Sequence, residues 1–192
     1  MKKIILFTAI TMFAFTTANA QGISFGAKAG LNLASVTGDG SDEVDGRTAF
    51  HIGAVVNIEF SELFALQPEV LYSAQGFSDD VDLGDLGMFE STVKLDYIIV
   101  PVLADITIVE GLSLQGGPQF GFNISSELEA DGETGEIEGV ETVDIAAAIG
   151  AQFELPIGLF FQARYVTGLT EIVDGGDFKN SNISISAGWF FN

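Results

Sequence analysis

Two short acidic runs contain the residue types that could bind a hard cation. They lie at residues 41–46 (SDEVDG) and 79–85 (DDVDLGD), and calcium prefers several carboxylate oxygens as ligands. Neither run has the twelve-residue spacing with a closing Glu that defines an EF-hand loop. We therefore expect a solvated acidic surface, with no metal site and no cofactor. The second run supplies only weak candidate ligands, namely Asp79, Asp80, Asp82 and Asp85.

The remaining residue types argue against an enzyme. His51 is the single histidine and has no recognisable Ser or Asp partner pattern, so we interpret it as an interior hydrogen-bonding residue. The chain has no cysteine, which excludes thiolate chemistry and a disulfide framework. It also has no phosphate-binding glycine loop and no zinc-ligand spacing. We predict no catalytic residues.

Three charged residues occur inside otherwise apolar or uncharged stretches. Glu69 follows Glu62 by seven residues, and Arg164 follows a turn at residues 156–158 by six or seven. Lys28 lies at a similar distance from residue 21. If all three stretches rise from the same end of one structure, the charges share one height and form an ionic cluster. A salt-bridged plug is our favoured interpretation, and a charged gate is the alternative.

The stretches that carry these charges alternate with a period of two. In FHIGAVVNIEF, residues 50–60, apolar and small side chains fall on one parity and polar ones on the other, with Val55 as the exception. Such alternation indicates a strand with one polar and one apolar face. Eight stretches of this kind follow one another. Residues 97–104 are apolar on both parities, so their facing is not predicted beyond an outward Tyr97, with Lys94 and Asp96 on the polar face.

The connections between these stretches alternate between short and long. Short links are predicted near residues 61–62, 107–111 and 156–158. The long links at residues 36–47, 76–91, 125–142 and 170–181 hold 19 of the 27 acidic residues. Long loops at one end and tight turns at the other are the layout of a bacterial outer-membrane barrel. The pattern therefore predicts an all-β fold, an eight-stranded antiparallel up-and-down transmembrane β-barrel.

The composition of the two faces indicates which one meets lipid. The polar face consists mostly of Gly, Ser, Ala, Asn and Gln, which suits the narrow interior of an eight-stranded barrel. The apolar face bears aromatic side chains near the strand ends, as in the two girdles that bound a lipid band. A soluble barrel with these aromatics in its core is the alternative. The expected outward aromatics are Phe50, Phe60, Phe64, Tyr97, Phe122, Phe153, Phe161, Tyr165, Trp189 and Phe191.

The first twenty residues have the features of a secretory signal peptide. Lys2 and Lys3 precede an apolar stretch, and residues 18–20 (ANA) form a cleavage site before Gln21. We predict a cleaved signal at residues 1–20 and a barrel domain at residues 21–192. The whole chain has a net charge of −20, so we expect no nucleic-acid partner.

Several segments in order resemble the small outer-membrane β-barrel family common in Bacteroidota, also called the porin family. These segments are GAKAGLNLA (residues 26–34), LQPEVLYSAQG (66–76), LDYIIVPVL (95–103), LQGGPQFGF (114–122), ARYVTGL (163–169) and ISAGWFF (185–191). The resemblance implies an outer-membrane location with both termini in the periplasm. It also implies contact with outer-membrane lipid and with the barrel-assembly machinery.

These expectations favour an integral outer-membrane protein with a structural or surface-interaction role. Four long acidic loops would face the cell exterior, and polar side chains would plug the lumen. The sequence names no extracellular ligand. A narrow low-conductance channel is the first alternative, and a soluble periplasmic lipocalin-like binder is the second.

Overall fold

The computed structural model describes residues 22–38, 45–82, 88–130, 133–137, 139–173 and 178–191. For residues 45, 79–82, 88–90 and 133 it describes the backbone alone. The predicted signal peptide at residues 1–20, and Gln21 after it, lie outside the described residues. Within the described ranges, no helix has the length and apolar character of a membrane span.

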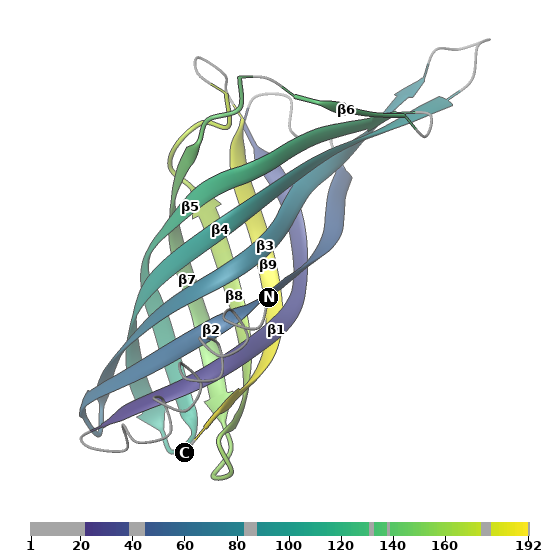
Figure 1. Ribbon diagram of the computed structural model, residues 1–192. Helices are drawn as coiled ribbons and strands as arrows, with labels where there is room; N and C mark the ends of the chain where they lie inside the picture. The colour runs from purple at the N-terminus through teal and green to yellow at the C-terminus, as the bar shows by residue number, and fades with distance from the viewer. Residues whose placement is uncertain are drawn as a thin grey trace, which may run out of the picture.

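Eight long strands close into a barrel, which confirms the predicted fold class. Consecutive barrel strands pair antiparallel, β4 pairs with β5, and the first barrel strand pairs with the last, so the sheet closes on itself (Figure 1). β6 is a short additional strand that pairs with β5 beyond the barrel wall. The strands are β1 (Ile23–Thr37), β2 (Asp45–Ser61), β3 (Phe64–Asp82), β4 (Met88–Val109), β5 (Leu112–Ala130), β6 (Glu133–Glu136), β7 (Val143–Glu154), β8 (Leu159–Gly168) and β9 (Lys179–Phe190).

The two ends of the barrel differ as the connection lengths predict. Tight turns join β2 to β3, β4 to β5 and β7 to β8 at one end, where β9 also finishes (Figure 1). Gly111 and Gly158 lie in two of these turns with φ of 80° each, a backbone conformation that glycine adopts without strain. At the opposite end β3, β4 and β5 extend past the other strands and carry β6 (Figure 1).

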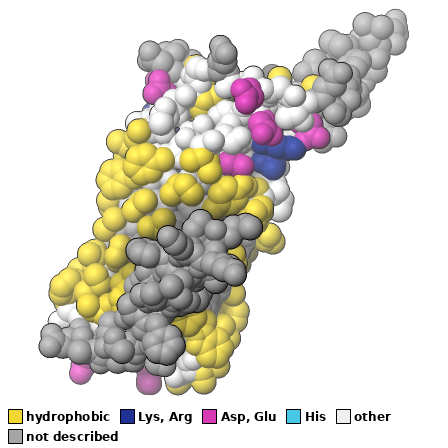
Figure 2. Space-filling model, in the orientation of Figure 1, with side chains coloured by type: hydrophobic (Ala, Val, Ile, Leu, Met, Phe, Trp, Pro, Cys, Tyr) yellow, Lys and Arg dark blue, Asp and Glu magenta, His cyan; other side chains and the backbone are white. Residues whose placement is uncertain are grey.

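Side-chain exposure alternates along the strands as the period of two predicts. Along β8, for example, Phe161, Ala163 and Tyr165 are exposed, whereas Gln162 and Arg164 are buried in the lumen. The visible exterior has a broad apolar band below a polar, charged end (Figure 2). The expected outward aromatics other than Tyr97 are exposed on this exterior, namely Phe50, Phe60, Phe64, Phe122, Phe153, Phe161, Tyr165, Trp189 and Phe191.

The prediction for Tyr97 is wrong, because this side chain points into the barrel and is 1% exposed. Leu95 and Ile99 share its inward parity, and Lys94 and Asp96 take the opposite one. The Asp96 carboxylate accepts a hydrogen bond from the outward Tyr72 hydroxyl at 2.7 Å. Above the apolar band the exterior meets water, so charges are tolerated outside while the interior packs apolar side chains. Lys94 and Asp96 were predicted to lie on the inner face of β4 because they are charged, and this assumption gave the wrong facing for the strand.

The exception at Val55 has a packing explanation. Val55 faces the interior and clusters with Phe160 and Phe190, each at most 1% exposed. The two rings lie 4.7 Å apart between centroids. This part of the lumen is therefore apolar, and an apolar residue on the inward parity of β2 fits it.

Arginine should have different effects at Val56, on the outer face of β2, and at Leu63, in the turn that follows β2. Val56 points outward between the girdle residues Phe50 and Phe60. We expect Val56→Arg to destabilise the inserted barrel by about 2–4 kcal/mol, because the charge enters the middle of the lipid band. Folding into liposomes, followed by urea unfolding, measures the effect.

Leu63 supplies the matched control, since it is 66% exposed in the β2–β3 turn outside the lipid band. Leu63→Arg should cost no more than about 1 kcal/mol. If Val56→Arg inserts and unfolds like the wild type, the exterior face of β2 does not contact lipid.

Candidate functional site in the barrel lumen

Three charged side chains from three strands meet in the lumen. Arg164 on β8 donates from Nη1 to Glu69 Oε2 at 2.9 Å and from Nη2 to Glu69 Oε1 at 2.7 Å. Lys28 on β1 pairs with Glu69 Oε2 at 2.8 Å. All three residues are at most 4% exposed. The structure therefore places the predicted residues Lys28, Glu69 and Arg164 in one buried ion-paired group, which we call the ionic cluster.

Small neighbours make room for these long side chains. Lys28 lies between Gly53 on β2 and Gly188 on β9, and Arg164 lies opposite Gly150 on β7. Interiors of small barrels are filled by side chains that alternate between large and small. The glycines on the inward parity are therefore part of what positions the ionic cluster.

The ionic cluster contains two cations and one carboxylate. The Gln162 carbonyl oxygen partly offsets the excess positive charge, because it accepts hydrogen bonds from Lys28 Nζ at 2.6 Å and from Arg164 Nη2 at 3.0 Å. A buried charge that loses its partner is costly, whereas an apolar replacement of a whole group is often neutral. The three charges are therefore expected to act as one unit in stability.

A network of glutamines connects the ionic cluster to the opposite wall. Gln67 Nε2 donates to Glu69 Oε1 at 3.0 Å and to Gln152 Oε1 at 3.2 Å. Gln162 Nε2 donates to Gln115 Oε1 at 2.6 Å, and Gln115 Nε2 donates to Asp105 Oδ2 at 2.6 Å. These bonds join β3, β4, β5, β7 and β8 across the lumen. Sequence reasoning placed these glutamines on polar strand faces but did not predict their mutual contacts, which depend on the stagger of the strands.

His51 has a structural environment on the loop side of the ionic cluster. Asn32 Nδ2 donates to the Ala74 carbonyl at 2.8 Å, which leaves Asn32 Oδ1 as an acceptor. His51 Nδ1–H therefore donates to Asn32 Oδ1 at 2.8 Å, and the Ser186 hydroxyl donates to Nε2 at 2.8 Å. Both ring nitrogens are engaged. Gly30 allows the ring to lie against β1, since a Cβ there would be 2.7 Å from His51 Cε1.

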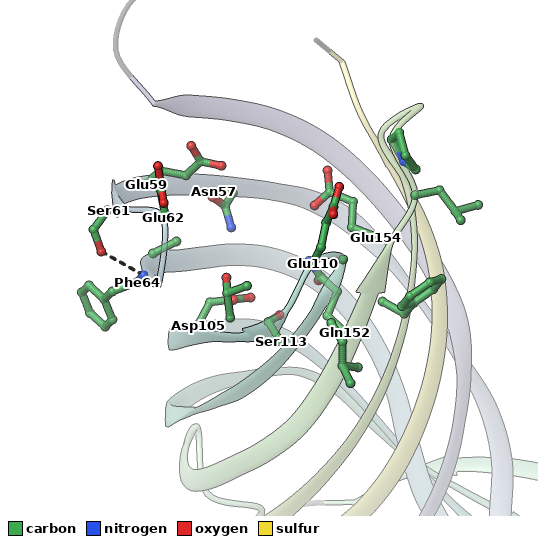
Figure 3. A pocket seen from close by; sticks show the side chains of 17 residues that line it. Asn57, Glu59, Ser61, Glu62, Phe64, Asp105, Glu110, Ser113, Gln152 and Glu154 are labelled. Carbon is green, nitrogen blue, oxygen red and sulfur yellow. Dashed lines mark hydrogen bonds between the residues drawn. The ribbon is translucent and has the colours of Figure 1, made fainter.

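A cavity of about 620 Å³ opens at the tight-turn end of the barrel (Figure 3). Its lining includes no Lys or Arg, and Gln152 and Ser113 lie on the side toward the glutamine network. We call this cavity the acidic vestibule, because its lining includes the carboxylates of Glu59, Glu62, Asp105, Glu110 and Glu154. Sequence reasoning missed it, because these acids come from three different strands, β2, β4 and β7, and from the β2–β3 and β4–β5 turns.

The weak metal candidates remain a prediction. Asp79, Asp80 and Asp82 belong to the extended part of β3, where only the backbone is described, and Asp85 lies outside the described residues. Among the side chains that the structure describes, no three of His, Asp or Glu are arranged to hold a metal ion.

The ionic cluster predicts unequal effects for its members. Glu69→Leu leaves both Lys28 and Arg164 without a carboxylate, so we expect a loss of about 3–5 kcal/mol in unfolding free energy. Arg164→Met should cost less, because the Lys28–Glu69 pair survives. The triple variant Lys28→Met, Glu69→Leu, Arg164→Met should recover much of the loss. Urea unfolding in liposomes measures each variant.

The exposed pair of Lys94 and Glu129 supplies a control, since both side chains are more than 30% exposed. Lys94→Met should leave the unfolding midpoint nearly unchanged, as for most surface ion pairs. A coupling between Glu69 and Arg164 within about 0.5 kcal/mol of zero would mean that the two residues behave independently.

Comparison with solved structures shows the same fold in other outer-membrane proteins. The crystal structure of Ail, the attachment invasion locus protein of Yersinia pestis, is similar with a TM-score of 0.56 and 16% identity, covering 89% of this chain and 99% of Ail. Neisserial surface protein A is similar with a TM-score of 0.61 and 13% identity, covering 88% of this chain and 99% of that protein. At these identities the likeness shows the fold alone.

Sequence comparison identifies the family. No curated protein matches the chain. The family described as "Outer membrane protein beta-barrel domain" matches residues 18–174. That match covers most of the 192 residues and all strands before β9. The chain therefore belongs to the outer membrane protein beta-barrel domain family, and it is a transmembrane β-barrel of the outer membrane.

Proposed function

We propose that this protein is an outer-membrane surface protein with a closed lumen and an outer end that contacts partners through acidic loops. The observation that carries the proposal is the fork between Arg164 and Glu69, which come from opposite walls and meet at 2.7 and 2.9 Å. A pore would need open space where these side chains meet. We therefore assign the function to the outer surface of the barrel and not to conduction through the lumen.

Three further layers of side chains support a closed lumen. The glutamine network crosses the barrel on the vestibule side of the ionic cluster. The hydrogen bonds of Asn32, His51 and Ser186 fill the loop side. A buried apolar cluster contains Leu71, Leu95, Tyr97 and Ile99, and two of its members, Leu71 and Ile99, line the same small cavity as His51 and Arg164. A hydrated ion would have to displace all of these layers, which disfavours the narrow-channel alternative.

Planar-bilayer recording tests the closed lumen. We expect the wild-type protein to give no conductance steps, because the ionic cluster and the glutamine network occupy the lumen. A triple variant that removes the charged side chains serves as the comparison for the conductance of the wild type. It carries Lys28→Ala, Glu69→Ala and Arg164→Ala. Reproducible steps from the wild type would establish the channel alternative, provided that heat-modifiable migration on a gel shows the sample to be folded.

The difference between the two ends of the barrel supports one orientation in the membrane. We propose that the tight turns, the acidic vestibule and both termini face the periplasm, and that the long acidic links face the cell exterior. Residues 1–20 would direct export and be removed, and the barrel-assembly machinery would insert the strands into lipid. The short turns and long loops of outer-membrane barrels have this arrangement.

The charge of the loop end indicates the kind of partner. Ail has been crystallised in complex with sucrose octasulfate, a heparin analogue and a polyanion. The long links of the present chain contain 19 acidic residues and two basic ones, Arg47 and Lys179, and Lys94 on β4 pairs with one of the acids, Glu129. We therefore propose a basic partner surface and expect no binding of heparin-like polyanions.

Single cysteines test the orientation, since the chain has none of its own. Glu136 in β6 and Glu62 in the β2–β3 turn are both exposed acids. In intact cells we expect Glu136→Cys to react with a membrane-impermeant maleimide and Glu62→Cys to react only after the outer membrane is permeabilised. The opposite pattern would reverse the proposed orientation, and equal labelling of both in intact cells would place neither end in the periplasm.

The remaining alternatives fit the structure less well. A soluble periplasmic binder would not present a broad apolar band to water (Figure 2), nor exposed aromatic side chains such as Phe60, Phe161 and Trp189. An enzyme centred on His51 would need a substrate to reach the imidazole ring, but this side chain is only 3% exposed and is enclosed in the lumen by its partners Asn32 and Ser186. We therefore propose no catalytic activity.

A further inference from the structure

Three buried polar atoms beside the ionic cluster have no hydrogen-bond partner among the described residues. They are Arg164 Nε, Gln119 Oε1 and Asn182 Oδ1. Each of these residues is at most 6% exposed. All three residues line the same cavity of about 10 Å³ in the barrel lumen, and residues of β1, β2, β3 and β4 complete its lining. Buried polar atoms in folded proteins are nearly always hydrogen bonded, so this cavity needs an occupant.

The chemistry of the three atoms is fixed by their neighbours. Arg164 Nε can only donate. Asn182 Nδ2 donates to Asn32 Oδ1 at 3.2 Å, so Asn182 Oδ1 must point away as an acceptor. Asn32 itself is held by its bond to the Ala74 carbonyl. With Gln119 Oε1 as the second acceptor, the cavity presents one donor and two acceptors.

We propose that a single water molecule binds in this cavity, accepting from Arg164 Nε–H and donating to Gln119 Oε1 and Asn182 Oδ1. A water offers two donors and two lone pairs, which satisfies all three atoms at once. The volume matches the 10–15 Å³ or so that one buried water needs. A cation would meet the positive charges of Arg164 and Lys28, and an anion would meet two amide oxygens, so neither suits the site.

The water would connect two networks that side chains alone leave apart. On one side, Arg164 already uses Nη1 and Nη2 on Glu69 and Gln162. On the other side, Asn182 joins Asn32, which holds His51. With the water in place, the Arg164 guanidinium donates along all of its edges, and a continuous polar layer spans the lumen. This site is independent of the proposed surface role, because its failure would leave the orientation and the conductance untouched.

Nuclear magnetic resonance of the folded wild-type barrel in detergent micelles tests the site directly. We expect a rotating-frame Overhauser cross-peak between water and the Arg164 Nε–H proton, with the sign of a through-space contact rather than chemical exchange. Arg47 and Arg164 are the only arginines in the chain, so the two Nε–H signals are assigned by an Arg47→Lys variant. No through-space water cross-peak at Arg164 Nε–H would overturn the proposal.

Gln119→Leu provides the second measurement. No described residue hydrogen bonds to the Gln119 side-chain oxygen, so the change removes one acceptor of the water without breaking a described protein hydrogen bond at that atom. We expect the binding constant of the water to fall about five-fold, as the loss of one hydrogen bond of about 1 kcal/mol implies, and the cross-peak at Arg164 Nε–H to weaken as the occupancy falls. An unchanged cross-peak in a folded Gln119→Leu barrel would remove Gln119 from the site and overturn the three-atom assignment.

Discussion

A carboxylate near the centre of a membrane barrel needs countercharges, and Glu69 has two of them. Lys28 and Arg164 reach it from different strands, and the three side chains can meet only if β1, β3 and β8 keep their mutual stagger. A slip of one residue in any of these strands would turn its charge toward lipid. The ionic cluster therefore selects the register of the barrel as well as filling its waist.

The strand faces could be predicted from the sequence because two environments impose opposite requirements on alternate residues. Inward parity at Lys28, Glu69 and Arg164 followed from the apolar neighbours on either side. Inference failed at Tyr97, because residues 97–104 are apolar on both parities and the prediction relied on Asp96, which faces outward, whereas Asp105 at the other end of this stretch faces the lumen. The alternation of residue types predicts the facing of a strand only where one face contacts lipid and the other face contacts a polar lumen.

Contacts across the lumen were less predictable than facing. The glutamine network joins Gln67, Gln115, Gln152 and Gln162 from four strands, and which of them meet depends on strand stagger. The acidic vestibule has the same origin, because Glu59, Glu110 and Glu154 are remote in sequence and converge only when the barrel closes. The alternation of residue types along a strand does not encode the angle at which the strand crosses the barrel axis. That angle decides which glutamines meet and which acids converge in the vestibule.

The acidic vestibule and the ionic cluster lie in series along the axis with opposite signs of charge. The vestibule carries five carboxylates, whereas the cluster carries one more cation than anions. If the lumen is closed as we propose, an anion approaching from the tight-turn end would be repelled at the mouth, and a cation drawn into the mouth would be repelled at the waist. The two charged regions would then form a bipolar electrostatic barrier that adds to the proposed steric closure.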